Sequence, residues 1–340
     1  MYQNLRSRSR AAPRPWDESK QRLSGALLPC LSARFSRRLD AKPFTAREWS
    51  ELERKLELNS LDAAELPRLT SEQMEDVLQI DKGEADRIAR LLGRSSLLLQ
   101  ELERLEALGI WLITRLDEGY PQRLVELLGR AAPLMLYGAG EARLLNQRGL
   151  AVVGSRNRDA RGFELTEFVG QSCAESNLIV YSGGARGVDK TAMGAALAAG
   201  GNAAGLLADS LVKAVRASDV RTAIDESHLV LATPYSPQAS FNVGTAMARN
   251  KLIYALSDFA LVIASDAEKG GTWAGAEEAL AAGWVPVFVV DGPDIRDGNR
   301  LLLKRGAIPF PFSIDLTSSL ADWLESMGTR SPTLVQGSLF

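Results

Sequence analysis

The feature that most constrains the fold is a series of six short apolar runs that alternate with helical patterns from residue 150 onward. The runs are continuously apolar rather than alternating, which is typical of strands buried on both faces of a sheet. Such strands form mostly parallel sheets covered by helices. We therefore predict an α/β fold with strands at residues 150–153, 178–181, 203–207, 228–232, 259–264 and 285–290.

A helical pattern precedes this region. Apolar residues recur every three or four positions, for example at Leu52 and Leu56, and the segment from Thr70 to Gln73 is typical of a helix start. The first strand candidate comes only at residues 110–113. We expect four parts: a basic, flexible N-terminal segment over 1–45, a small helical domain over 46–115, the α/β domain over 116–317 and a tail over 318–340 without a winged helix.

Composition excludes several classes of function. The net charge of −2 excludes a globally basic surface, so any polyanion must bind at a local patch. The chain has two cysteines, which indicate neither a disulfide framework nor a zinc site, and its one histidine, His228, begins an apolar run and reads as structural. We find no apolar segment of membrane-spanning length and no signal-peptide pattern. We expect a cytoplasmic protein without a cofactor.

A glycine-rich turn follows the second predicted strand. In parallel sheets, ligands bind outside the carboxyl ends of the strands, and a glycine turn that opens a helix offers backbone N–H groups to an anion. Asp189 stands where a nucleotide-hydrolysing P-loop requires glycine, so we expect no ATP hydrolysis. Ser182 and Asp189 also fit as caps of the following helix. The candidate phosphate ligands in this turn are Ser182, Gly183, Gly184, Arg186, Gly187 and Lys190.

Glycine, small hydroxyl side chains and cations recur in the other loops at the same sheet edge. The loop after the first strand contributes Gly154, Ser155 and Arg156. The segment leading into the fifth strand contributes Arg249, Asn250 and Lys251, and the loop after that strand contributes Lys269, Gly270, Gly271 and Thr272. Together they predict a basic pocket for several phosphates or one nucleotide.

The region from Tyr120 to Ala307 resembles the DNA-processing protein A family, also called Smf. The resemblance rests on Gly154-Ser155-Arg156, on the motif from Ser182 to Asp189, and on Arg249-Asn250 followed by Ile253. It implies an extended Rossmann-like domain that binds single-stranded DNA, forms a homodimer, hands DNA to a RecA-like recombinase and has no established catalytic turnover. It also implies a sterile-alpha-motif-like domain in the N-terminal helices. By the same resemblance, Arg156, Arg186 and Lys251 neutralise phosphates, and the N–H groups of Gly183, Gly184, Gly270 and Gly271 hold phosphate oxygens.

Departures from the family pattern keep two alternatives open. Gly270-Gly271-Thr272 followed by Glu277 resembles the loop of the lysine-decarboxylase-like nucleoside-monophosphate phosphoribohydrolases, in which a carboxylate stabilises an oxocarbenium-like ribose. The Glu277-Glu278 pair also fits a solvated helix face. The second alternative is a nucleotide-signal sensor or antitoxin of a phage-defence locus, whose helical domain acts on an operon-encoded partner. The pattern leaves open whether the ligand is DNA, RNA or a nucleotide.

Overall fold

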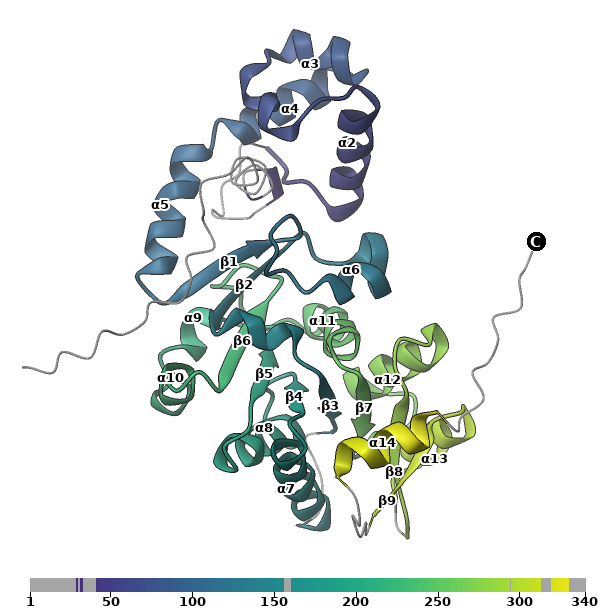
Figure 1. Cartoon of the computed structure of the whole chain (residues 1–340). Coiled ribbons are helices and arrows are strands. Elements are labelled where there is room, and N and C mark those ends of the chain that lie inside the picture. The colour runs from purple at the N-terminus through teal and green to yellow at the C-terminus, as the bar shows by residue number, and fades with distance from the viewer. Residues whose placement is uncertain are drawn as a thin grey trace, which may run out of the picture. The chain divides into compact units, whose positions relative to one another are not determined.

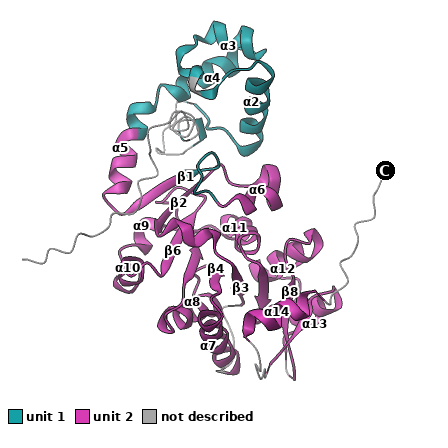
Figure 2. Ribbon diagram, in the orientation of Figure 1, with its two compact units in different colours: residues 1–98, 113–120 teal, residues 99–112, 121–340 magenta. Residues whose placement is uncertain are grey.

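The computed structural model describes residues 29, 31–32, 41–155, 160–293, 295–312 and 319–329 (Figure 1). They form two compact units (Figure 2): unit 1 is Met1–Leu98 with Ile113–Tyr120, and unit 2 is Leu99–Leu112 with Pro121–Phe340. The four-part division expected from the sequence stays a prediction. Most of its N-terminal segment and residues 330–340 of its tail lie outside the described residues.

Unit 1 is built from short helices whose starts are set by their capping residues. Thr45 and Thr70 each form a capping box, in which the hydroxyl accepts an N–H of the first turn while Glu48 or Gln73 accepts the N–H of the cap residue. The helix start predicted at Thr70 is confirmed. The helices are α2 (Ala46–Leu58), the 3-10 helix η1 (Ala63–Arg68), α3 (Ser71–Leu78) and α4 (Lys82–Leu92), followed by α5 (Ser95–Glu106), which runs on into unit 2.

The core of unit 1 comes from the apolar stripes of these helices. Trp49, Leu52 and Leu56 of α2 are buried, as are Ile88 and Leu91 of α4. Their spacing of three and four residues places them on one face of each helix. The periodicity seen in the sequence therefore marks the packed faces of this unit.

A mostly parallel sheet of nine strands forms the centre of the α/β part, which confirms the predicted fold class. Its order is β1-β2-β6-β5-β4-β3-β7-β8-β9, and β2 is antiparallel to β6 while the pairs from β6 to β9 are parallel. The strands are β1 (Ile110–Thr114), β2 (Met135–Gly140), β3 (Gly149–Val153), β4 (Ile179–Ser182), β5 (Ala203–Leu206), β6 (Leu229–Thr233), β7 (Phe259–Val262), β8 (Val287–Asp291) and β9 (Ile308–Pro311).

Two of these strands were not expected as strands. β2 contains Gly138 and Gly140, and β9 contains Pro309 and Pro311, residues that weaken a strand pattern. Gly138 is required because a Cβ there would lie 2.1 Å from the Trp111 ring, which crosses the strand. The prolines are tolerated because β9 is an edge strand.

Helices cover the sheet on both faces. The crossovers after β3 and β4 run one way along the sheet and those after β7 and β8 run the other way, so right-handed connections place their helices on opposite faces. In agreement, α7 packs on α8 and α11 packs on α12. The helices of this part are α6 (Gln122–Leu128), the 3-10 helices η2 (Gly129–Ala131) and η3 (Ala142–Asn146), α7 (Ala160–Glu175), α8 (Val188–Ala198), α9 (Leu211–Ala214), α10 (Ser218–Asp225), α11 (Val243–Leu256), α12 (Gly270–Ala282), α13 (Asp297–Lys304) and α14 (Leu320–Gly328).

Candidate functional site

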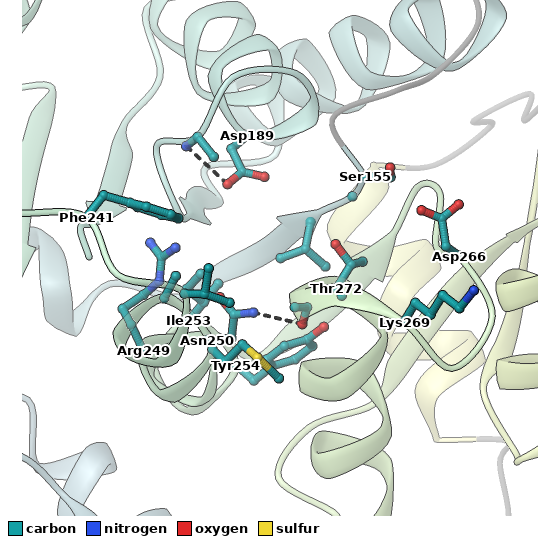
Figure 3. Close-up of a pocket in the computed structure, with 18 of the residues that line it drawn as sticks. Ser155, Asp189, Phe241, Arg249, Asn250, Ile253, Tyr254, Asp266, Lys269 and Thr272 are labelled. Atoms are coloured by element: carbon teal, nitrogen blue, oxygen red, sulfur yellow. Dashed lines mark hydrogen bonds between the residues drawn. The ribbon is translucent and has the colours of Figure 1, made fainter. Parts of the chain in front are cut away.

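A cavity of about 750 Å³ lies at the carboxyl edge of the sheet, at the switch point between β3 and β7 (Figure 3). The chain leaves these neighbouring strands in opposite directions, which opens a crevice at their ends. Gly154 and Ser155 follow β3 and line the cavity, and the Ser155 N–H donates to the Ala264 carbonyl at 2.8 Å. The two loops are thereby held together where a ligand of such a sheet is expected.

The loop after β7 is fixed from below by α13. Asn299 is 1% exposed, and its Oδ1 accepts the Ser265 N–H at 2.8 Å while its Nδ2 donates to the Ile263 and Val290 carbonyls. Gly298 allows the close approach, because a Cβ there would lie 2.3 Å from the Ser265 carbonyl oxygen. The loop that carries Asp266 and Lys269 thus starts from a rigid base.

The N-terminus of α12 opens onto this cavity. Lys269 precedes the helix without a side-chain hydrogen bond to its first turn, and Lys269, Gly270, Gly271 and Thr272 all line the cavity. Asn250 of α11 donates from Nδ2 to the Gly271 carbonyl at 2.8 Å (Figure 3). The first N–H groups of a helix of 13 residues therefore face the cavity beside an exposed ammonium group, an arrangement suited to an anion.

A second cavity of about 360 Å³ lies against the glycine-rich turn between β4 and α8. Gly183, Gly184, Arg186 and Lys190 line it, and both cations are exposed. Gly184 and Gly187 have φ values of +67° and +98°, which residues other than glycine rarely adopt. Asp209, after β5, contributes a carboxylate to the same cavity.

The two cavities share a wall made by Ala185, Phe241, Ala246 and Arg249. Arg249 is only 6% exposed, and its Nη1 donates to the Gly183 carbonyl at 2.8 Å. Asp189 is 9% exposed and accepts the Ala185 N–H at 3.3 Å. Burial raises the pKa of Asp189 and lowers the pKa of Arg249, and the opposite charge of the other residue counteracts each shift.

The structure brings most of the sequence-predicted site residues to these two cavities. Three described residues do not line them. Ser182 is fully buried and donates from its hydroxyl to the Val152 carbonyl at 2.6 Å, Gly187 precedes α8, and Lys251 of α11 lines neither cavity. A fourth predicted residue, Arg156, lies outside the described residues. The residues that do line a cavity are Gly154, Ser155, Gly183, Gly184, Arg186, Lys190, Arg249, Asn250, Lys269, Gly270, Gly271 and Thr272.

Other lining residues were missed by sequence reasoning. Arg296, which precedes α13, pairs with Asp266 at 2.5 Å, and its place in the loop after β8 was the available signal. Phe241, Val243 and Met247 add an apolar rim with exposed fractions of 53%, 66% and 43%. Val243 and Met247 belong to α11 and Phe241 precedes it, and no motif in the sequence marks them as lining residues.

Glu277, the carboxylate considered for N-glycosidic cleavage, lies elsewhere. It forms an ion pair with Arg305 and accepts the Trp273 Nε1–H at 3.1 Å, while the Arg305 guanidinium stacks 4.8 Å from the centre of the Trp273 ring. It lines neither cavity. The described residues also contain no cluster of histidine, cysteine and acidic side chains that could hold a metal ion.

His228 has a structural partner, as its position at the start of an apolar run indicated. Its Nδ1 lies 2.9 Å from Oδ1 of Asn202, and it lines neither cavity. Among the helices that the structure describes, none has both the length and the apolar character to cross a membrane.

Comparison with known proteins agrees with this architecture. The family model described as DNA recombination-mediator protein A matches residues 111–320. The DNA processing protein DprA of Streptococcus pneumoniae is 31% identical over 182 residues, which are 52% of this chain and 63% of that protein, so the match spans less than two thirds of the relative.

Two solved structures share the fold. The crystal structure of the S. pneumoniae protein has a TM-score of 0.55 at 24% identity and covers 78% of this chain and 95% of its own. A structure of DNA processing protein A from Helicobacter pylori, described by its single-stranded DNA binding mode, has a TM-score of 0.52 at 23% identity and covers 64% of this chain and 97% of its own. At these identities the likeness concerns the fold.

Proposed function

Because the chain belongs to the DNA recombination-mediator protein A family, we propose that it binds single-stranded DNA at the carboxyl edge of its sheet. The observation that supports this most is the convergence of two helix N-termini on adjoining cavities that share a wall. Each N-terminus is accompanied by exposed cations, Arg186 and Lys190 at α8 and Lys269 at α12. In this proposal a chain of phosphates binds at both helix N-termini at once.

The local charge supports binding of a polyanion despite the net charge of −2. Two of the three carboxylates that line the cavities are partly neutralised within the protein, because Asp266 pairs with Arg296 and Asp189 faces Arg249, whereas Asp209 is exposed. Arg186, Lys190 and Lys269 are exposed and form no ion pair with another described residue. In this proposal these cations contact phosphate oxygens together with the N–H groups of Gly184, Gly270 and Gly271.

Affinity for a short strand at one protomer is modest in this proposal. Each hydrogen bond to a charged partner is worth roughly 1.5–3 kcal/mol, and only a few are available per protomer. A homodimer that presents two such edges gains affinity by linking two binding events. The proposal also includes the homodimer, the transfer of DNA to a RecA-like recombinase and a cytoplasmic location. Its alternative role is in phage defence.

The proposal assigns no hydrolytic turnover to the protein. Glu277 pairs with Arg305 and Trp273 and lines neither cavity, so the carboxylate considered for N-glycosidic cleavage is not part of the proposed binding site. No structural observation favours that alternative. Release of free base from a nucleoside monophosphate, lost in Glu277→Gln, would nevertheless establish it.

One titration tests the proposal. Fluorescent single-stranded DNA, duplex DNA and a panel of nucleotides are titrated with the protein at two or more salt concentrations. Single strands should bind more tightly than duplex, with log K falling against log salt by about 0.7 for every phosphate contacted. Tight, salt-insensitive binding of one nucleotide and none of the polymer would replace DNA binding by nucleotide sensing.

A further inference from the structure

Arg249 differs from the other cations at the cavities in its burial. Arg186, Lys190 and Lys269 are exposed, whereas Arg249 is 6% exposed and lies within α11. Its Nη1 already donates to a carbonyl of the protein, that of Gly183, at 2.8 Å. Its side chain lines both cavities, but with little of it exposed and one terminal nitrogen bonded to the protein, it offers a phosphate less contact than the exposed cations do.

The surroundings of Gly183 show how closely Arg249 holds the turn. A Cβ built at Gly183 would lie 2.7 Å from both terminal nitrogens of Arg249 and 2.7 Å from Oδ2 of Asp189. The guanidinium and the carboxylate therefore both lie on the side of Gly183 where a side chain would project. Asp189 in turn accepts the Ala185 N–H at 3.3 Å, so the two charged groups bond to the turn on either side of Gly184.

The peptide that joins Gly183 to Gly184 links this contact to the cavity. The bond is trans, and in a trans peptide the carbonyl and the following N–H point in opposite directions. With the Gly183 carbonyl held by Arg249, the Gly184 N–H is directed away from the guanidinium. Gly184 lines the 360 Å³ cavity with a φ of +67°. Glycine adopts many backbone conformations, so without a bond to the neighbouring peptide this residue would leave that conformation readily.

We infer that Arg249 is a positioning residue, which orients the glycine-rich turn for phosphate by bonding the Gly183 carbonyl and does not itself contact the DNA. The inference rests on the proposed function for its ligand. It replaces the role of phosphate ligand expected for Arg249 from the sequence, and it leaves that role with Arg186 and Lys190. Asp189 completes the arrangement, because it balances the buried positive charge.

The test compares variants of a buried and an exposed arginine. Arg249→Met removes the bond to Gly183, and Arg249→Met combined with Asp189→Asn removes both buried charges, so that no unpaired carboxylate destabilises the fold. Arg186→Met is the matched variant of a proposed phosphate contact. Arg221→Met, on exposed α10 and lining neither cavity, is the control for loss of an arginine.

Binding of an oligothymidylate is measured for each variant over a series of salt concentrations. Arg186→Met should reduce the magnitude of the salt slope by about 0.7. The Arg249→Met/Asp189→Asn variant should lose affinity by about tenfold at every salt concentration, the equivalent of one lost hydrogen bond to a phosphate, with the slope unchanged. A slope reduced as in Arg186→Met, or an affinity equal to that of the wild type, would overturn the inference.

Amide hydrogen exchange gives a readout that needs no DNA. The amides from Gly184 to Gly187 should exchange at least tenfold faster in both Arg249 variants, while the amides of α10 stay unchanged. If the wild type binds no single strand, the proposed function fails, and the exchange data still decide the role of Arg249. Unchanged exchange in the turn would show that Arg249 does not hold it.

Discussion

Replacing Gly183 by alanine tests how tightly the glycine-rich turn is packed. The added Cβ would lie 2.7 Å from the Arg249 terminal nitrogens and from Oδ2 of Asp189, closer than real Cβ contacts. These groups are buried at 6% and 9% exposure, so neither can turn aside into solvent. Overpacking of this kind costs about 1–3 kcal/mol, and we expect Gly183→Ala to destabilise the α/β part by that amount.

Gly194→Ala is the matched control, since Gly194 lies in α8 and, apart from its own helix backbone and chain neighbours, no atom lies within 4 Å of the added Cβ. Alanine is the better helix former, and this change should stabilise by about 0.5–1 kcal/mol. Urea denaturation followed by circular dichroism compares the two variants with the wild type. If Gly183→Ala is as stable as Gly194→Ala, Arg249 and Asp189 do not pack closely against Gly183, and Arg249 does not hold the turn.

Three further predictions concern the other charged groups. Arg186→Gln should weaken binding of single-stranded DNA by about tenfold or more with little change in melting temperature. Binding is titrated at several salt concentrations, and a thermal melt is recorded for the same variant. A much lower melting temperature with normal binding would instead make Arg186 a structural residue. Arg305→Gln removes the ion-pair partner of Glu277, and because both side chains are more than one third exposed it should cost about 1 kcal/mol or less in urea and leave DNA affinity unchanged. The Arg87 guanidinium lowers the pKa of Glu48 from 4.5 to about 2, so this pair stabilises unit 1 above pH 4.5 and loses its contribution as the pH falls toward 2. Glu48→Gln should remove that part of the acid dependence of the melting temperature, measured over a pH series. After solvent screening the contribution is at most about 1 kcal/mol.

The parts of the fold that the sequence predicted are those governed by local pattern. Each of the six apolar runs forms a strand of the parallel part, and Thr70 begins a helix, because continuous burial and capping are written into adjacent residues. β2 and β9 could not be predicted in this way. Gly138 in β2 leaves room for the Trp111 ring, and Pro309 is tolerated in β9 because that strand lies at the edge of the sheet. Such requirements appear only once the sheet is assembled.

The residues of the candidate site could likewise be predicted only in part from the sequence. The glycine-rich loops could be located from the sequence, because their residues follow strands and open helices within a few positions. Ser182 belongs to the same motif, yet its hydroxyl bonds the Val152 carbonyl of the neighbouring strand and is fully buried. The motif alone does not reveal which of its members face the cavity.

The sequence by itself thus determined the α/β class and the loops that carry the small and basic residues, since both follow from the order of apolar and polar groups along the chain. Only the tertiary structure decided that β3 and β7 are neighbours, that the N-termini of α8 and α12 open onto cavities with a common wall, and that Arg249 is buried against Gly183. The physical reason is distance along the chain: Arg249 and Gly183 are 66 residues apart, and a contact of that kind depends on the packing of α11 against the sheet rather than on any local preference.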